Sequence, residues 1–440
     1  MDQKTVFTGI NDMAQDNQVQ LPQNPNESLP ELSSKEVNQQ PFQPPPISPP
    51  RNFVNSREGS GESFFSSKIF KALLGLIFLI IVFAILYIFV LPRFQSKEPK
   101  NATLTYWGLW EDQRIMGSII SEFEKQNPNI KIEYSKQDIK GYRKKIDTRI
   151  ANGTGPDIFK FHNTWYPMLS KYLIPFPEDV ISKQDFKNYF YPVIQHDLIQ
   201  NGGIYGIPLG IDTLSLYINV DAFNAASISP PTGWPEFIEA SKALTVKEES
   251  GKIKTAGAAL GTYANINHAP DIISLLFAQK GVTAENLSSK KEAAQDALDF
   301  YTSFSKNEKT WDDTLDNSQL AFAKGNLAMY FGYSWDFFAI KAMNPSLNFK
   351  ILPVPSLLNR STTIASYWAE GVSAKSKNQQ EALLFIKFLA RKETVQKLFT
   401  ETSKTRSFGV PYARVDLVDS LRENDNIYPF AFQAKNAESS

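Results

Sequence analysis

Hydrophobic positions are distributed unevenly along this chain of 440 residues. Residues 72–91 form a run of twenty residues without a charge, ALLGLIFLIIVFAILYIFVL. A helix rises about 1.5 Å per residue, so this run would span roughly 30 Å, the thickness of a bilayer's hydrocarbon core. A helix also satisfies its own backbone polar groups in lipid. The run therefore predicts a single transmembrane signal-anchor helix, within a segment that we place at 68–92.

A cleaved signal peptide explains this run less well. The run begins too late in the chain, exceeds the 7–15 apolar residues of a signal sequence, and is followed by no small-residue cleavage site. A lipid-modified N-terminal cysteine is excluded because the sequence contains no cysteine. Basic residues flank the run on both sides and give a slight bias toward an internal N-terminus. They are Arg51, Arg57, Lys68 and Lys71 before the run, and Arg93, Lys97 and Lys100 after it.

The segments on either side of the run differ in composition. Residues 1–67 are rich in Asn, Gln, Ser and Pro, with few apolar residues to offset the entropy cost of ordering, so we expect a disordered arm. Residues 93–101 are a short polar spacer. Residues 102–440 are aromatic-rich and too long for one typical core, so we expect a domain of two lobes.

Strand and helix periods alternate at the start of this domain. Strand patterns at 103–107, 130–134 and 157–161 are separated by helical patterns at 115–123 and 142–150, where apolar residues recur every fourth position. This β-α-β-α-β order predicts an α/β fold with a parallel sheet and right-handed crossovers. Open sheets of this kind bind ligands beyond the carboxyl ends of their strands.

The rest of the domain continues the mixed pattern. Residues 204–219 are strand-like but interrupted by Pro208 and Gly210, which suits a crossover between lobes. Further helices are predicted at 234–244, 271–279, 291–305 and 382–389, and further strands at 325–332 and 349–354. No internal repeat is visible in the sequence.

Composition narrows the functional classes. The 46 basic and 46 acidic residues cancel, which gives nucleic-acid binding little support. The absence of cysteine excludes disulfides, thiol catalysis and cysteine metal sites. The three histidines are scattered, and the acidic cluster at 312–316 lacks the spacing of a calcium loop. No glycine-rich phosphate fingerprint occurs, so we expect neither a metal nor a cofactor.

Tryptophans mark the predicted strand ends and loops. An indole face packs against the C–H face of a sugar ring, while carboxylates and amides bind its hydroxyl groups. Four of the seven tryptophans lie at such ends beside a polar residue, which indicates a carbohydrate-binding cleft. The four are Trp110 with Glu111, Trp165 with Asn163, Trp335 with Asp336, and Trp368 with Glu370. Core packing is the alternative for any single tryptophan, and we assign Trp234 to packing.

An enzymatic function has weaker signals. A glycoside hydrolase needs two facing carboxylates. Glu111, Asp212 and Glu370 are the best candidates, but the sequence places no pair of them at the required separation. The sequence also lacks a G-x-S-x-G nucleophile elbow. We therefore expect binding without catalysis.

An ordered set of segments resembles a known family. The set comprises TLTYWGLWED, FEKQNPNIKIEY, GTGPDIF, GGIYGIPLGIDTLSLYINVDAF, PPTGWPEF, FAKGNLAMYFGYSW and EGVSAKSKNQQEALLFIKFLA. In this order it resembles the family 1 extracellular solute-binding proteins of ABC sugar importers, the maltose-binding-protein-like group, over residues 103–412. The chain departs from many members of that family because neither a cleavable signal nor a lipidated cysteine is visible.

The resemblance implies a two-lobed periplasmic-binding-protein-like clamp of type II that closes on its ligand about hinge strands. Lobe one would comprise about 102–211 and 365–405, and lobe two about 212–364 and 406–440. The positions that match the family's ligand contacts are Trp110, Glu111, Asn163, Trp165, Asp212, Tyr263, Asn265 and Trp335, followed by the weaker transfers Trp368, Glu370 and Arg406.

We therefore expect a membrane-anchored extracellular protein that captures a mono- or oligosaccharide and delivers it to an ABC permease. Its N-terminus would be cytoplasmic. A surface sensory or adhesive receptor with the same clamp is an alternative, and a carbohydrate-active enzyme is a weaker one. A polyamine or glycerol phosphate ligand stays open, although few basic residues occur in the predicted loops. The sequence does not identify the sugar, the permease, the oligomeric state or the role of the arm.

Overall fold

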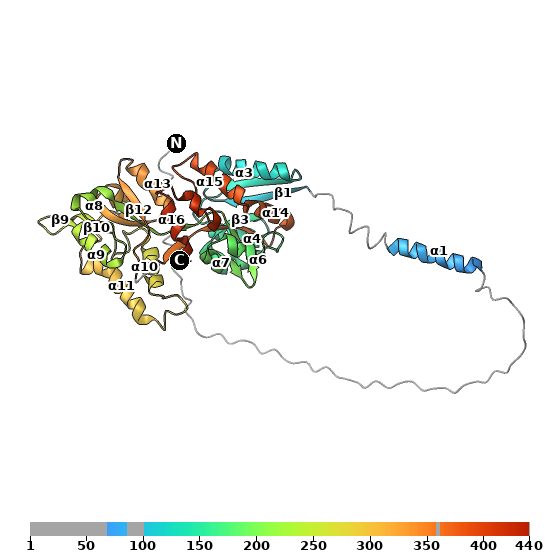
Figure 1. Cartoon of the computed structure of the whole chain (residues 1–440), viewed down its shortest axis with the longest axis horizontal. Helices are drawn as coiled ribbons and strands as arrows, with labels where there is room; N and C mark the ends of the chain where they lie inside the picture. Colours follow the sequence, from blue (N-terminus) through green and yellow to red (C-terminus); the bar gives the residue numbers. More distant parts are fainter. Residues whose placement is uncertain (1–67, 86–100, 358–360, 440) are drawn as a thin grey trace, which may run out of the picture. The chain divides into compact units, whose positions relative to one another are not determined.

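The computed structural model describes residues 68–85, 101–357 and 361–439. The chain divides into two compact units, Met1–Pro99 and Lys100–Ser440. In the first unit the structure describes helix α1, Lys68–Ile85 (Figure 1). The predicted arm, the end of the predicted membrane span and most of the spacer lie outside the described residues.

Helix α1 carries exposed apolar side chains. The large ones are Leu76, Ile77, Phe78, Leu79, Ile80, Ile81 and Phe83. Within residues 68–85, 101–357 and 361–439, no helix combines the length and the apolar character needed to span a bilayer.

The second unit contains a five-stranded sheet with the order β2-β1-β3-β14-β6. Figure 1 labels β1 and β3 of this sheet. Strand β1 pairs in parallel with β2 and β3, and β14 pairs antiparallel with β3 and β6. This first sheet confirms the parallel β-α-β-α-β order predicted from the sequence. Its strands are β1 Ala102–Gly108, β2 Ile130–Lys136, β3 Ile158–His162, β6 Ile207–Pro208 and β14 Trp368–Val372.

Three helices of this sheet follow the predicted hydrophobic periods. They are α3 Gln113–Gln126, α4 Tyr142–Ala151 and α14 Gln379–Leu389. Helix α3 begins after Asp112, whose Oδ1 accepts the N–H groups of Arg114 and Ile115. Phe385 of α14 packs edge-on against Tyr106 of β1, with ring centroids 5.8 Å apart. These apolar contacts fix the helices on the sheet and leave the carboxyl ends of β1 and β3 for loops.

A second five-stranded sheet has the order β12-β8-β11-β10-β9. Every residue of β8 and β11 is buried, which is typical of strands covered on both faces. Figure 1 shows β10, β12 and their helices in one half of the unit, with β1, β3 and α14 in the other. The strands are β8 Ser215–Asn219, β9 Val246–Lys247, β10 Ile253–Ala258, β11 Leu327–Gly332 and β12 Phe349–Leu352. The helices of this part are α8 Val220–Ala226, α9 Trp234–Ala243, α10 Ala269–Gln279, α11 Lys291–Lys306, α12 Ser318–Ala323 and α13 Ser334–Met343.

Short strands connect the two sheets. As predicted, the interrupted run at 204–219 passes from one sheet to the other, through β6 of the first sheet and β8 of the second. Between them lies a three-stranded sheet with the order β15-β13-β7, formed by β7 Asp212–Thr213, β13 Thr363–Ser366 and β15 Ala437–Ser439. The Gln433 side chain donates hydrogen bonds to Leu214 O and to Ser215 Oγ, which ties the C-terminal segment to this crossover. The residue limits of the two lobes remain a prediction.

The remaining elements are short, apart from one helix. They are η5 Asn163–Trp165, α5 Tyr166–Leu169, η6 Ser170–Tyr172, α6 Lys183–Tyr189, α7 Pro192–Leu198, β4 Ile199–Gln200, β5 Gly203–Ile204, α15 Lys392–Ser403, η7 Val415–Leu421, α16 Tyr428–Gln433 and η8 Ala434–Asn436.

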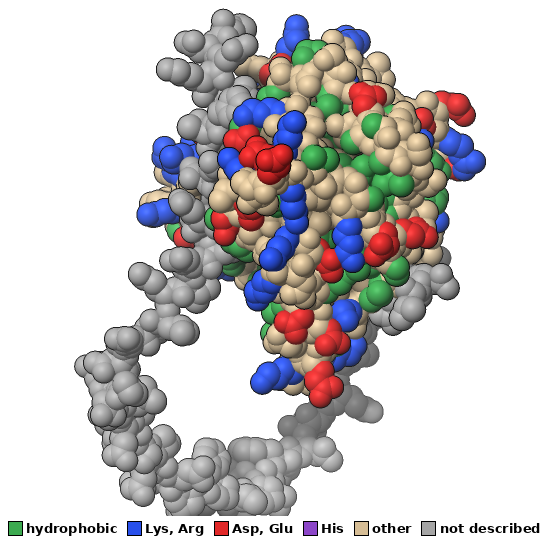
Figure 2. Space-filling view, turned by 90° about the vertical axis from the view of Figure 1, so that its left-hand side faces the viewer, with side chains coloured by type: hydrophobic (Ala, Val, Ile, Leu, Met, Phe, Trp, Pro, Cys, Tyr) green, Lys and Arg blue, Asp and Glu red, His purple; other side chains and the backbone are tan. Residues whose placement is uncertain are grey.

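Surface charge agrees with the balanced composition on the face that Figure 2 displays. Lys and Arg side chains are interspersed there with Asp and Glu side chains. This face therefore lacks the one-sign field that nucleic-acid binding requires.

Candidate functional site

Aromatic side chains gather at the carboxyl end of β3. We call Trp110, His162, Trp165 and Trp368 the first aromatic group. The Trp368 ring is central: its centroid lies 5.7 Å from Trp110, 5.0 Å from Trp165 and 5.3 Å from His162, all in edge-to-face geometry. Trp110 keeps 47% of its surface exposed. The structure thus brings three sequence-predicted tryptophans together, with one of them open to solvent.

Strand pairing explains this gathering. Strand β14 runs antiparallel to β3, and its first residue, Trp368, pairs with His162, the last residue of β3. Trp165 follows three residues after His162, in η5. The carboxyl ends of β1 and β3 lie at one edge of the sheet because these strands are parallel. The loop that carries Trp110 therefore emerges beside them.

Two predicted ligand acids of the first sheet share a buried lysine. Lys160 Nζ lies 2.8 Å from Glu111 Oε2 and 3.4 Å from Glu370 Oε1. All three side chains are at most 6% exposed. Burial raises the pKa of Glu370 to about 7, where Lys160 opposes this effect and Glu111 adds to it. Burial would also raise the pKa of Glu111, but the Lys160 cation holds it below its ordinary value. In this structure these acids bind Lys160.

Arg406 is influenced by the charges of acids from both parts of the domain. Its guanidinium stands over the ring of Phe338 in α13, 5.0 Å from the centroid. Burial lowers the pKa of Arg406, while the charges of Glu111 and Asp212 raise it. Among the described residues its buried Nε has no hydrogen-bond partner. Arg406 therefore has a donor left for a ligand oxygen.

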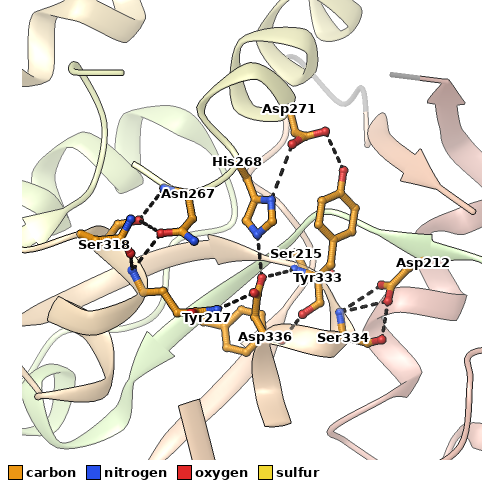
Figure 3. Close-up of polar contacts among 12 residues, drawn as sticks. Asp212, Ser215, Tyr217, Asn267, His268, Asp271, Ser318, Tyr333, Ser334 and Asp336 are labelled. Atoms are coloured by element: carbon orange, nitrogen blue, oxygen red, sulfur yellow. Dashed lines mark hydrogen bonds and ion pairs between the residues drawn. The ribbon is translucent and has the colours of Figure 1, made fainter. Parts of the chain in front are cut away.

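Asp212 links β7 of the three-stranded sheet to the start of α13 (Figure 3). Its carboxylate accepts the backbone N–H of Ser334 at 3.1 Å, the Ser334 hydroxyl, and the N–H of Thr213 at 2.9 Å. A helix N-terminus favours such a negative charge. Burial nevertheless raises the pKa of Asp212 to about 7, against the lowering effect of the Ser334 hydrogen bonds. The structure places Asp212 in an internal link between β7 and α13.

A second aromatic group follows β11 and consists of Tyr333 and Trp335. Their rings are stacked, with centroids 4.4 Å apart and an interplanar angle of 16°. The Tyr333 hydroxyl donates to Asp271 Oδ1 at 3.0 Å (Figure 3). Tyr333 covers one face of the Trp335 ring. Trp335 is only partly buried, so part of its surface stays accessible.

An acid that binds the second aromatic group also acts on the first through its charge. Burial lowers the pKa of His162 in the first group to about 4, and the Asp271 carboxylate opposes this effect. Asp271 belongs to α10, which lies in the half of the unit that contains the second sheet (Figure 1). Its carboxylate accepts the hydroxyl of Tyr333 of the second group. The charge of Asp271 therefore affects the pKa of His162, although the two residues come from different parts of the domain.

The predicted amide ligands have internal partners. Asn163 is buried and donates to Ser439 Oγ at 2.6 Å and to Asp197 Oδ2 at 3.3 Å. Asn265 donates to backbone carbonyls of the 312–315 segment and accepts from the Trp311 indole N–H at 3.1 Å. Both side chains therefore stabilise loops in this structure. Tyr263 differs, since 57% of its surface is exposed.

Two cavities lie elsewhere. One of about 300 Å³ is lined by residues within 175–183 and 201–205. The other, of about 340 Å³, is lined by Tyr191 and by residues within 415–435. None of the sequence-predicted site residues lines either cavity. The candidate site therefore rests on the aromatic groups and on Arg406.

Sequence reasoning missed the residues that support this site. Lys160 interrupts the apolar strand IFKFH, and a lysine at such a position signals a buried acidic partner. His268 and Asp336 contact each other over a separation of 68 positions, and no local pattern signals that pair. Tyr333 stands two residues before Trp335 in the GYSW segment, and this aromatic spacing is the signal that identifies it.

Comparisons with known proteins agree with the fold. The chain is 25% identical over 325 residues to the multiple sugar-binding protein of Streptococcus mutans, which covers 69% of this chain and 74% of the relative. A cyclo/maltodextrin-binding protein complexed with maltotetraose has a similar structure, with a TM-score of 0.63, 19% identity, and coverage of 78% of this chain and 88% of that one. The sugar-binding protein MalE from Xanthomonas citri gives a TM-score of 0.62 at 19% identity, over 77% and 87% of the two chains.

These likenesses establish an α/β, two-lobed, periplasmic-binding-protein-like fold. The matching family model is that of the bacterial extracellular solute-binding proteins, and it covers residues 118–409. This range includes both five-stranded sheets except for β1, together with both aromatic groups except for Trp110. The chain therefore belongs to the family of bacterial extracellular solute-binding proteins.

Proposed function

We propose that the chain captures a carbohydrate between its two lobes and delivers it to an ABC permease. The observation that carries this proposal is the pair of aromatic groups, with the Trp165–Trp368 contact at the end of the first sheet and the Tyr333–Trp335 stack after β11 of the second. Rings of this kind stack on the C–H faces of a sugar. The names of the relatives, a multiple sugar-binding protein and a maltodextrin-binding protein, support the same ligand class.

The ligand contacts would come from both lobes. We assign stacking to Trp110, Trp165, Trp335, Trp368 and Tyr263, because these rings are exposed or partly buried. Arg406 would donate to a sugar oxygen. Glu111, Asn163, Asp212, Asn265 and Glu370 would reach the sugar only if ligand binding rearranged their present partners. Binding would favour the closed clamp because that state completes the contacts of both lobes.

A hydrolytic function receives little support from the geometry. Glu111 and Glu370 both face Lys160 and are nearly or fully buried, so they do not form an open pair across a substrate. Asp212 is occupied by Ser334 and Thr213. A surface receptor that uses the same clamp is the second candidate, and a permease-dependent uptake assay distinguishes it from a transport protein.

Titration with carbohydrates tests the proposed function. A panel of mono- and oligosaccharides should include one that changes tryptophan fluorescence and raises the melting temperature of the full chain. Detection of neither effect across the panel would contradict carbohydrate binding. Trp335→Ala should weaken the binding of the active sugar.

We also propose that the chain is anchored in the cell membrane by one helix, with the large domain outside. The uncharged run of 72–91 supports this anchor, and so do the exposed apolar side chains of α1. External protease on intact cells should then digest residues 101–440. Full protection of that region, with digestion restored only after lysis, would contradict the proposed orientation.

A further inference from the structure

His268 occupies a constrained position at the start of α10. Its backbone has φ of +60°, a left-handed conformation that is uncommon for a side chain other than glycine. The imidazole is largely buried, with 11% of the side chain exposed. Its Nε2 lies 2.8 Å from Asp336 Oδ2, and its Nδ1 lies 3.6 Å from Asp271 Oδ2 (Figure 3). The ring therefore lies between two carboxylates from different helices.

The same two carboxylates hold both ends of one tyrosine. The backbone N–H of Tyr333 donates to Asp336 Oδ2 at 2.9 Å, and its hydroxyl donates to Asp271 Oδ1 at 3.0 Å. The His268 ring also meets the Tyr333 ring edge-on, with centroids 5.1 Å apart. Asp336 is fixed from a further side by the Gln319 amide at 2.6 Å. His268 thus links the two acceptors that set the position of the Tyr333 ring.

Tyr333 in turn supports Trp335. The two rings are nearly parallel at 4.4 Å, so the tilt of one ring constrains the tilt of the other. His268 also contacts Trp335 directly, with ring centroids 6.2 Å apart. Few alternative side-chain arrangements remain for Trp335 while these contacts are intact.

Charge makes His268 suited to this position. Burial alone would lower the pKa of His268, but Asp336 and Asp271 raise it to about 10. The other titratable groups that act on this cluster are Tyr330 and Tyr333, together with His162, Asp212 and Tyr217. Burial raises the pKa of the three phenols. A protonated imidazole therefore balances two carboxylates over the physiological pH range.

We propose that His268 is a positioning residue, which as a cation between Asp271 and Asp336 fixes Tyr333 and thereby orients Trp335 toward the C–H face of a sugar ring. This proposal rests on the proposed carbohydrate binding. His268 would thus affect carbohydrate affinity through Trp335, although its own imidazole is bound to Asp271 and Asp336.

A double-mutant cycle on the full chain tests the coupling. His268→Gln should reduce the affinity for the active sugar of the panel by about tenfold, which corresponds to about 1.4 kcal/mol. In a Trp335→Ala background the same substitution should reduce affinity less than about twofold, since the ring it positions is absent. Equal losses in both backgrounds, or unchanged affinity in the single variant, would overturn the proposal.

A matched control and a second variant separate positioning from stability. Gln279→Leu removes a buried amide at the opposite end of α10. In the wild type, the Gln279 side chain accepts the indole N–H of Trp234 at 2.7 Å. The substitution should lower the melting temperature while leaving affinity unchanged. If His268→Gln does not fold, Tyr333→Phe replaces it in the cycle, because this substitution removes only the hydrogen bond from the Tyr333 hydroxyl to Asp271. Tyr333→Phe should reduce affinity in the wild-type background and reduce it less in the Trp335→Ala background. Additive losses for Tyr333→Phe would overturn the proposal.

A ligand-free measurement separates this proposal from the proposed function. The indole N–H resonance of Trp335, identified by its disappearance in Trp335→Ala, should shift in His268→Gln and stay in place in Gln279→Leu. If no carbohydrate binds the wild type, the proposed function fails, but this shift still supports the positioning of Trp335. An unshifted resonance would overturn the positioning role whatever the panel gives.

Discussion

Lys160 pairs with Glu370 across β3 and β14, and its Nζ lies 3.4 Å from Glu370 Oε1. The same Nζ lies 2.8 Å from Glu111 Oε2, in the loop that also carries Trp110. Among the described residues, neither carboxylate oxygen of Glu370 has a hydrogen-bond partner, so its ion pair with Lys160 is its main stabilising contact. The ion-paired group therefore connects the sheet interior to the loop that carries Trp110.

Removal of the lysine should destabilise the domain strongly. Lys160→Met leaves two buried carboxylates without their cation, and breaking a buried pair in this way costs about 3–5 kcal/mol. Urea unfolding should report this loss. The control is Lys131→Met, which breaks an exposed pair with Glu124 at 3.1 Å and should cost less than about 1 kcal/mol. Equal stability of the two variants would contradict the buried ion pair.

Glu370 should make stability depend on pH. Its pKa rises from an ordinary value of 4.5 to about 7 in the folded chain. The folded state therefore binds the proton more tightly than the unfolded state, and the resulting stability is complete below pH 4.5 and is lost as pH rises through 7. Glu370→Gln should flatten the decline of the melting temperature over this window. An unchanged pH profile would contradict the burial effect on Glu370.

Asp212 contributes in the same direction, since its pKa rises from 3.8 to about 7. Part of the decline should therefore persist in Glu370→Gln. It should disappear in a variant that also carries Asp212→Asn. The double variant thus separates the two carboxylates in the same calorimetric experiment.

The C-terminal segment should stabilise the connection between the sheets. Gln433 Nε2 donates to three acceptors of the crossover, with distances of 3.1 Å to Thr213 Oγ1, 3.1 Å to Leu214 O and 2.5 Å to Ser215 Oγ. Gln433→Leu removes the donor to Thr213 Oγ1 and Ser215 Oγ, whereas Leu214 O still accepts from Thr363 Oγ1. Each buried group that is left unsatisfied costs about 1–3 kcal/mol. Chemical denaturation should show a loss in that range or above it. A neutral result would mean that water or a rearranged chain satisfies these acceptors.

Trp335→Ala should weaken carbohydrate binding by about tenfold or more without loss of the fold, because it removes a stacking surface. Trp234→Phe is its control. Trp234 is 4% exposed and binds Gln279, so its substitution should lower the melting temperature and leave affinity unchanged. The opposite pattern would place the ligand away from Trp335.

The sequence predicted most of the local structure of the domain. The helical periods at 115–123 and 142–150 fall within α3 and α4, and the run at 325–332 contains β11. These predictions are confirmed because local periodicity is a direct consequence of which face each element buries. The same reasoning identified the tryptophans of both aromatic groups, since they lie at strand ends or in the loops that adjoin them.

The partners of the polar residues were beyond local reasoning. Asn163 binds Ser439, which is 276 positions away, and Asp212 binds Ser334, which is 122 positions away. Such pairs depend on how the two sheets connect, and no periodicity encodes that connection. The sequence therefore located aromatic groups well, whereas it did not reveal that Asn163, Asp212 and Asn265 have internal partners.

A crystal structure of the chain with its best-bound carbohydrate would test the central claim most directly. We predict one sugar between the two lobes, with C–H faces packed on Trp368 or Trp110 from the first aromatic group and on Trp335 from the second. A sugar that contacts one lobe only, or that occupies the cavity beside Tyr191, would contradict capture between the lobes.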